Sequence, residues 1–186
     1  RSDGEKMSFD SPHAAANHVI RMVYQELDLF PHLTVAENIC QGNIPKNKAG
    51  MVDWKEMERV SKELLKLIKV DINVNERIDR LSIAQQQIAA IARALNGNCK
   101  FILLDEPTSA LPKKDVENLF AIVRNLKKEG ISVVFISHKL DEMMDITDRI
   151  TILNNGKKVA TVQTSDINEE LLAEMVVGKT IKNKYP

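Results

Sequence analysis

Two short apolar runs that end in polar residues constrain the fold of this chain more than any other feature. Phe101 to Leu104 is followed by Asp105-Glu106-Pro107, and Val133 to Ile136 is followed by Ser137-His138. Runs of this length are typical of buried strands. Apolar residues at helical spacing over 116–126 predict an amphipathic helix between them. A strand, a helix and a second strand in this order predict a right-handed parallel crossover.

The middle third of the chain, residues 34–95, carries helical signals. Asp53 with Glu56 three residues later resembles a capping box, and a second helix start lies at Ser82, with Gln85 three positions on. Each start is followed by apolar residues at helical spacing: Met57, Val60, Leu64 and Ile68 after the first, and Ile88, Ile91, Ala92 and Leu95 after the second. These patterns predict an α-helical subdomain.

The flanking segments return mainly to strand patterns. An apolar run over 18–24 predicts a strand that ends at the polar pair Gln25-Glu26. Apolar residues over 150–153 and 159–162 flank Asn155-Gly156, a strong signal for a hairpin turn. A last helix is predicted over 171–176.

Composition excludes several classes of protein. The 26 basic residues equal the 26 acidic ones, so no overall field draws the chain to nucleic acid or to an anionic membrane. No stretch approaches the roughly 18 apolar residues that cross a bilayer, and no signal peptide pattern is present, so we expect a soluble, cytosolic chain. Cys40 and Cys99 sit in no disulfide or metal-binding pattern and are interpreted as ordinary thiols.

Asp105 and Glu106 place two adjacent carboxylates at the carboxyl end of a predicted parallel strand, where open α/β sheets bind ligands. Because successive strand residues point to opposite faces, we expect the two carboxylates to take different roles. The spacing alone also fits a strand that ends in a solvated acidic loop. Likewise, His138 alone also fits a histidine that caps a loop, and Gln25 alone fits a surface residue.

Five segments in a fixed order resemble the motifs of the ATP-binding domain of ABC transporters. Leu81 to Gln87 is similar to the signature motif, Phe101 to Pro107 to Walker B with its following glutamate, and Thr108 to Leu111 to the D-loop entry. Val23 to Glu26 resembles the Q-loop, and Val134 to Lys139 the switch segment. The resemblance covers residues 1–186.

The resemblance implies a role for each candidate catalytic residue. Asp105 would hold Mg²⁺, since a hard cation prefers carboxylate oxygen and keeps much of its water. Glu106 would be the base that orients and deprotonates the attacking water. His138 would contact the γ-phosphate of ATP. Gln25 would sense Mg²⁺ and water and pass the state of the site to membrane subunits.

The predicted helix start at 82–85 is the candidate cofactor-binding segment. A free helix N-terminus with the Ser82 hydroxyl and the small Ala84 suits close approach to phosphate, and Gln85 belongs to the same turn. In the family that phosphate belongs to ATP held by the opposite subunit. Ala84 replaces the usual second glycine of the signature. Pro112 stands where the family commonly has aspartate or threonine, which puts the D-loop contact in question.

The fold implied is α/β: a P-loop NTPase-like, mostly parallel sheet core with an inserted α-helical ABC subdomain. We assign residues 1–28 and 98–186 to the core and residues 29–97 to the helical subdomain that bears the signature motif. The core is expected to be incomplete, because the Walker A segment that precedes the Q-loop in the family is missing.

The P-loop pattern Gly-x-x-x-x-Gly-Lys-Ser/Thr occurs nowhere in the 186 residues. Gly178-Lys179-Thr180 is not interpreted as part of a P-loop, because Ala173 stands at the position of the first glycine and the triplet follows a predicted helix instead of opening one. Gly4 to Pro12 resembles the strand and turn that follow the P-loop. We therefore expect the chain alone to bind ATP weakly or not at all and not to hydrolyse it. A missing P-loop strand would also expose strand edges, which predicts a homodimer, strand exchange or marginal stability.

Within the family, the signature sequence, the Q-loop and the chain's ending resemble the first ATPase domain of tandem monosaccharide importers. This implies a second ATPase domain and transmembrane permease subunits as partners, no nucleic acid, and a location on the cytoplasmic face of the membrane. Importers of coenzyme-like molecules or nucleosides stay open. Two further alternatives are a non-transport ABC ATPase and a non-enzymatic interaction module built on the helical third.

Overall fold

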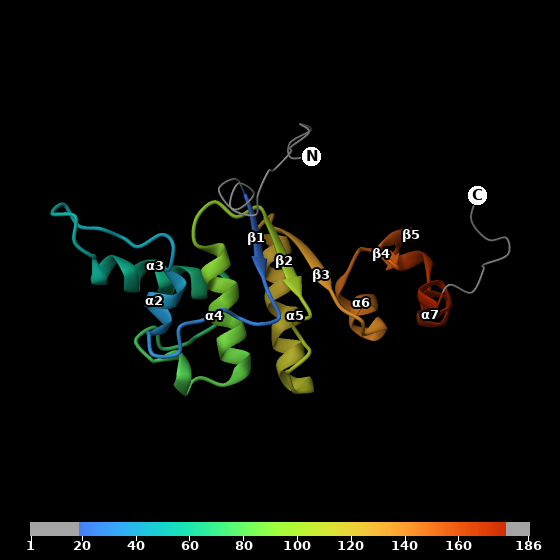
Figure 1. Cartoon of the computed structure of the whole chain (residues 1–186), viewed down its shortest axis with the longest axis horizontal. Coiled ribbons are helices and arrows are strands. Elements are labelled where there is room, and N and C mark those ends of the chain that lie inside the picture. The colour runs from blue at the N-terminus through green and yellow to red at the C-terminus, as the bar shows by residue number, and fades with distance from the viewer. Residues whose placement is uncertain (1–18, 178–186) are drawn as a thin grey trace. The chain divides into compact units, whose positions relative to one another are not determined.

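The computed structural model describes residues 19–177, and Figure 1 shows the whole chain. The contacts of the chain divide it into two units that meet between Ile136 and Ser137, called unit 1 and unit 2 below. Two segments discussed above lie outside the described residues: residues 4–12, which resemble the strand and turn after the P-loop, and the Gly-Lys-Thr triplet at 178–180.

Unit 1 is built on a parallel sheet of three strands in the order β1-β2-β3. The strands are β1 (Ile20–Val23), β2 (Phe101–Asp105) and β3 (Ser132–Ile136), and helix α5 (Lys113–Lys128) connects β2 to β3. The register pairs Met22 with Leu103, and Leu103 with Val134. The predicted strand, helix and parallel strand are therefore confirmed, and Gly130 follows the helix at a φ of 78°.

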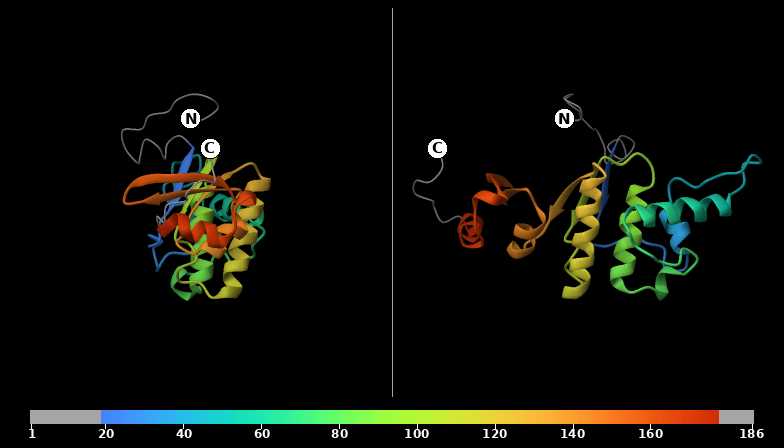
Figure 2. Two further views of the ribbon diagram at one scale, coloured as in Figure 1. Left: turned by 90° about the vertical axis from the view of Figure 1, so that its right-hand side faces the viewer. Right: turned by 180° about the vertical axis from the view of Figure 1, so that it is seen from behind.

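The two faces of this sheet differ in burial. Ile102 and Leu104 of β2 are fully buried, and Phe135 of β3 meets Phe120 of α5 edge to face with 6.0 Å between ring centroids. Figure 2 shows α5 lying across this face of the sheet. On the opposite face Met22 and Val134 keep 37% and 47% of their surface exposed. Among residues 19–136, the sheet of unit 1 is thus packed on one side and more exposed on the other.

The helical third of the chain is confirmed as a group of helices beside β1. They are α2 (Val35–Ile39), α3 (Trp54–Leu67), the 3-10 helix η1 (Ile78–Arg80) and α4 (Ile83–Leu95). Helix α4 packs on β1 as well as on α2 and α3, which ties these helices to the sheet. The boundaries 29–97 of a separate helical subdomain remain a prediction, since contacts group all residues up to 136 in one unit.

One of the two predicted capping boxes is complete. The Ser82 hydroxyl accepts from the Gln85 N–H, and the Gln85 amide oxygen accepts from the Ser82 N–H. At α3 the Asp53 carboxylate caps the Glu56 N–H, but the return bond is replaced: the Asp53 N–H donates to the Pro45 carbonyl. The prediction of a box there was wrong in its second half, because Glu56 pairs with an arginine of its own helix.

Unit 2 contains helix α6 (Leu140–Ile146), the hairpin strands β4 (Arg149–Asn154) and β5 (Lys157–Gln163), the 3-10 helix η2 (Thr164–Asp166) and helix α7 (Glu169–Val177). The hairpin turn is confirmed at Asn155-Gly156, where both residues have positive φ. Its small core consists of Ile150, Ile152, Leu172 and Met175. None of the helices within residues 19–177 is long and apolar enough to cross a membrane.

The two cysteines are free thiols, as predicted. Cys40 is buried between α2 and α3, with its sulfur 3.7 Å from the Ser61 hydroxyl oxygen. Burial raises the pKa of the Cys40 thiol, and likewise that of Cys99, so neither is set up as a reactive thiolate.

Candidate functional site

The predicted pair of carboxylates lies at the carboxyl end of β2. Asp105 is the last residue of the strand, and Glu106 follows it with a φ of 46°, in the left-handed region that residues with a side chain rarely adopt. The expectation that both are strand residues with alternating directions was wrong for Glu106, because the backbone turns there. Its N–H donates to the Ile136 carbonyl at 2.9 Å, which fixes the turn against β3. Such a conformation costs on the order of 1–3 kcal/mol and is concentrated at functional sites.

Gln25 shares this edge of the sheet. It follows β1 by two residues and is exposed, and β1 pairs with β2 in parallel, so both strands end on the same side. The structure therefore brings Gln25, Asp105 and Glu106 to one edge of the unit 1 sheet. This placement was predicted from the parallel topology.

His138 follows β3 by two residues, and the last residue of β3, Ile136, pairs with Asp105. The histidine itself belongs to unit 2. Its approach to the two carboxylates stays a prediction.

The segment after Gln25 is held by an arginine that the sequence analysis did not single out. Arg93, near the end of α4, donates to the carbonyl oxygens of Leu27 at 2.9 Å and Asp28 at 2.7 Å. Asp28 has a φ of 46°, so the backbone here is also in the left-handed region. Burial lowers the pKa of Arg93, an effect that the nearby Asp28 carboxylate opposes. Arg93 thus ties the helix that begins at Ser82 to the segment that follows Gln25.

Replacing Arg93 with alanine is expected to free residues 25–30 from α4. Each hydrogen bond from a charged donor contributes about 1.5–3 kcal/mol, so we expect the loss of two to have a large effect on the stability of this contact. Arg93→Lys should restore only part of that stability, because lysine lacks the forked pair of donors that reaches two carbonyl oxygens. The measurement is hydrogen exchange of the peptide that covers 25–30. Arg59→Ala is the matched control, since Arg59 pairs only along its exposed helix. Unchanged exchange in Arg93→Ala would refute the coupling.

The N-terminal turn of α4 carries the three candidate cofactor-binding residues. Ser82 is the N-cap, and Ala84 and Gln85 lie in the first turn. The N–H groups of Ile83 and Ala84 have no acceptor among the described residues, as expected for the first turn of a helix. The helix dipole adds partial positive charge at this end. The first turn of α4 therefore presents two backbone donors and the Ser82 hydroxyl to an anion.

Next to this turn lies a cavity of about 310 Å³ between the N-terminal ends of α4 and α5. Its wall includes Ser82, Ala84 and Gln85 from α4, and Leu111 and Asp115 beside and within α5. Pro112 is the N-cap residue of α5, with a φ of −60° and no side-chain capping bond. The structure thus brings the signature-like segment and the D-loop-like segment together in unit 1.

The comparisons with known proteins agree with these segments. A sequence profile described as ABC transporter matches residues 1–109, more than half of the chain. The chain belongs to the ABC transporter family.

Relatives of this ABC chain match it almost from end to end. It is 38% identical to the ribose import ATP-binding protein RbsA of Rhodopirellula baltica over 96% of its length, and 40% identical to a putative ribose/galactose/methyl galactoside import ATP-binding protein of Geobacillus kaustophilus over 98%. The chain spans only 35% and 37% of the lengths of these two relatives.

Solved structures confirm the predicted fold class, α/β with a P-loop NTPase-like parallel sheet and helices. The ATP-binding cassette MJ0796, in a dimeric post-hydrolysis state bound to ADP and Pi, matches with a TM-score of 0.68 at 30% identity. The match covers 84% of this chain and 68% of the cassette.

The residues at the site fit ATP and Mg²⁺ by their chemistry. Asp105 offers carboxylate oxygen, which Mg²⁺ prefers, at the sheet edge where open α/β folds bind ligands. The first turn of α4 offers backbone donors and a hydroxyl suited to phosphate. Residues 19–177 contain no group of three or more His, Cys, Asp or Glu side chains that could hold a metal ion.

Proposed function

We propose that this chain supplies the Walker B, signature and switch segments of the ATP-hydrolysing subunit of an ABC transporter that imports a monosaccharide. The observation that carries the proposal is the match over nearly the whole chain to proteins named for ribose and galactose import. The strained Glu106 beside Asp105 supports it, because strain of this kind is retained where a side chain must be aimed.

Each candidate residue has one role in this proposal. Asp105, with Gln25 on the same edge of the sheet, would hold Mg²⁺ through water, and the bound cation would supply positive charge to the phosphates of ATP. Glu106 accepts a proton from the attacking water and orients it. His138 donates to the γ-phosphate and holds its position. Glu106 suits its role because the backbone takes a left-handed turn there, so its side chain does not follow the alternating directions of the side chains in β2.

The first turn of α4 acts on a different nucleotide. Ser82, Ala84 and Gln85 bind the γ-phosphate of ATP held by a second ATPase domain, so hydrolysis occurs at an interface between two domains. The dimeric form of the cassette that matches this fold supports such a pairing. Transmembrane permease subunits complete the transporter and place the chain on the cytoplasmic face of the membrane. The bound sugar is recognised elsewhere in the assembly.

The chain by itself binds ATP weakly and has no turnover in this proposal. Its 186 residues contain no P-loop pattern, so no lysine and no glycine-rich backbone cradle the β- and γ-phosphates. The edges of β1 and β3 have no strand neighbour within residues 19–177. Open edges favour pairing with another chain, so we also propose homodimerisation or strand exchange of the isolated chain.

Calorimetry with ATP and Mg²⁺ tests the proposal on two proteins. One is the 186-residue chain, and the other is a hybrid in which a P-loop-bearing segment of a ribose import relative precedes it. Binding and turnover by the hybrid alone are expected. Tight binding by the 186-residue chain would overturn the assignment of the phosphate cradle, and a folded hybrid that fails to hydrolyse ATP would overturn the ATPase assignment.

A further inference from the structure

The segment that joins α2 to α3 forms a compact projection, called the basic tip below and defined as residues 44–55. Figure 1 shows it extending from α2 to the end of unit 1 and returning to begin α3. Lys46 and Val52 form an antiparallel bridge, and the Asn47 N–H donates to the Met51 carbonyl at 2.8 Å. The Asn47 side-chain oxygen accepts from the N–H groups of Ala49 and Met51. The tip is therefore an ordered turn that is stabilised by hydrogen bonds between its own residues.

Large apolar side chains of the basic tip face water. Met51 is 64% exposed, Trp54 60% and Ile44 42%. The inward face of α3 is supplied by other residues, among them the buried Met57 and Leu65, so Trp54 is not needed to hold the helix in place. Exposed apolar groups gathered on one projection mark an interaction site more often than single scattered ones do.

The basic tip carries three lysines and one carboxylate, that of Asp53, and is therefore positively charged overall. Lys46, Lys48 and Lys55 are exposed, and their ammonium groups make no ion pair with any residue in 19–177. The Asp53 carboxylate is used to cap α3. Lys55 lies in the first turn of α3, where the helix dipole disfavours a cation, so folding gains nothing from its charge. The tip thus combines apolar side chains with three lysines against one aspartate, although the whole chain has no net charge.

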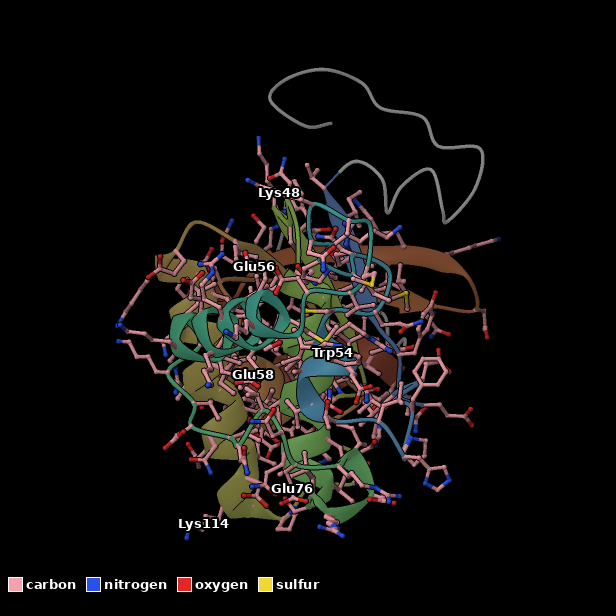
Figure 3. All side chains as sticks on the ribbon, turned by 90° about the vertical axis from the view of Figure 1, so that its left-hand side faces the viewer. Lys48, Trp54, Glu56, Glu58, Glu76 and Lys114 are labelled. Atoms are coloured by element: carbon pink, nitrogen blue, oxygen red, sulfur yellow. The ribbon has the colours of Figure 1, made fainter. Side chains whose placement is uncertain are left out.

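The acidic side chains near the start of α3 pair with basic residues of the same helix. Glu56 pairs with Arg59, and Glu58 pairs with Lys62 at 3.2 Å. Each of these acids therefore has a basic partner within its own helix, although Arg59 also pairs with Glu63. Figure 3 labels Lys48 at the top of this face and Trp54 well below it, with Glu56 at a height between them and Glu58 lower down.

We propose that the basic tip docks on the surface of an anionic lipid bilayer. Tryptophan, other apolar side chains and lysines together are the composition of segments that lie in a membrane interface. Each lysine near an anionic surface adds electrostatic attraction that falls off within a Debye length. The backbone N–H groups of Asn47, Ala49, Gly50, Met51 and Asp53 find acceptors within the tip, which lowers the cost of bringing this turn to the membrane interface. This proposal concerns unit 1 alone and does not rest on the proposed ATPase function.

A lipid surface fits the tip better than an acidic protein segment does. Standard protein interfaces use about 20–30 residues on each side, whereas the tip has twelve positions and projects outward. A fluid surface of headgroups accommodates a small convex projection without a matching hollow. The exposed Ile44, Met51 and Trp54 supply apolar groups for the headgroup level, and the exposed lysines supply charge opposite to that of anionic headgroups.

Trp54 is the chain's only tryptophan, so its fluorescence reports on the tip directly. The experiment mixes the 186-residue chain with vesicles of phosphatidylcholine alone or with added phosphatidylserine. We expect a blue shift of Trp54 emission and co-sedimentation only with phosphatidylserine, both reversed by high salt. Lys46→Glu with Lys48→Glu is expected to weaken binding at least about tenfold, and Trp54→Ala to weaken co-sedimentation.

The matched control is Lys113→Glu with Lys114→Glu, an equal charge change at exposed positions of α5. Figure 3 labels Lys114 away from Lys48 on the same unit. Unchanged emission with phosphatidylserine vesicles, or an equal loss of binding in the α5 variant, would overturn the proposal. A blue shift with polyglutamate but not with vesicles would overturn it in favour of an acidic protein partner. Far-ultraviolet circular dichroism verifies that each variant is folded.

Discussion

Replacing Glu106 with glutamine in the P-loop-bearing hybrid is expected to lower kcat about a thousandfold, within the range of general-base effects. Glutamine keeps the size of the side chain and the N–H that donates to the Ile136 carbonyl, so the left-handed turn is retained. The amide cannot accept a proton from water at neutral pH. Turnover is measured by phosphate release, and ATP affinity by calorimetry.

Affinity for ATP and Mg²⁺ should change little in Glu106→Gln, because Asp105 remains to hold the cation. The matched control is Glu117→Gln, which removes a carboxylate from the exposed side of α5 and should leave kcat unchanged. If Glu106→Gln keeps turnover within about threefold of the parent hybrid, Glu106 is not the base. If ATP binding is lost instead, the residue serves the cation rather than the water.

The parallel core and the edge that carries Gln25, Asp105 and Glu106 could be predicted from the sequence because their signals are local. Buried strands in such folds appear as short apolar runs, and parallel pairing then brings their carboxyl ends to one side. The left-handed turn at Glu106 carries no such signal. It is imposed by the hydrogen bond to Ile136, thirty residues further along the chain.

Two features of the helical third show the difference between local and distant causes. Thr34 and Glu37 form a complete capping box at α2 that was readable in the sequence and overlooked. The contact of Arg93 with the carbonyls of Leu27 and Asp28 could not be read, because it joins residues 65 and 66 positions apart through backbone acceptors of any sequence. The side chains of residues 27 and 28 therefore give no signal that predicts this contact.

Neighbouring leucines on β2 give the second large prediction, since they lie on opposite faces of the sheet. Leu104 is fully buried against the helices, whereas Leu103 is half-buried between the exposed Met22 and Val134. Leu104→Ala is expected to lower the free energy of unfolding by about 2–5 kcal/mol through lost burial and the cavity that remains. The measurement is urea unfolding of the 186-residue chain.

Leu103→Ala is the matched control on the same strand, and its expected cost is about 1 kcal/mol because less of the side chain leaves water on folding. Equal losses in the free energy of unfolding at the two positions would mean that the open face of the sheet is covered in solution.

Repeating the urea unfolding at several protein concentrations shows whether a second copy of the chain covers this face. A midpoint that rises with concentration for the parent chain, and no longer does so in Leu103→Ala, would identify a second copy as the cover. A small cost at Leu103 that is independent of concentration would instead show that the isolated chain keeps this face exposed, as its three-stranded sheet predicts.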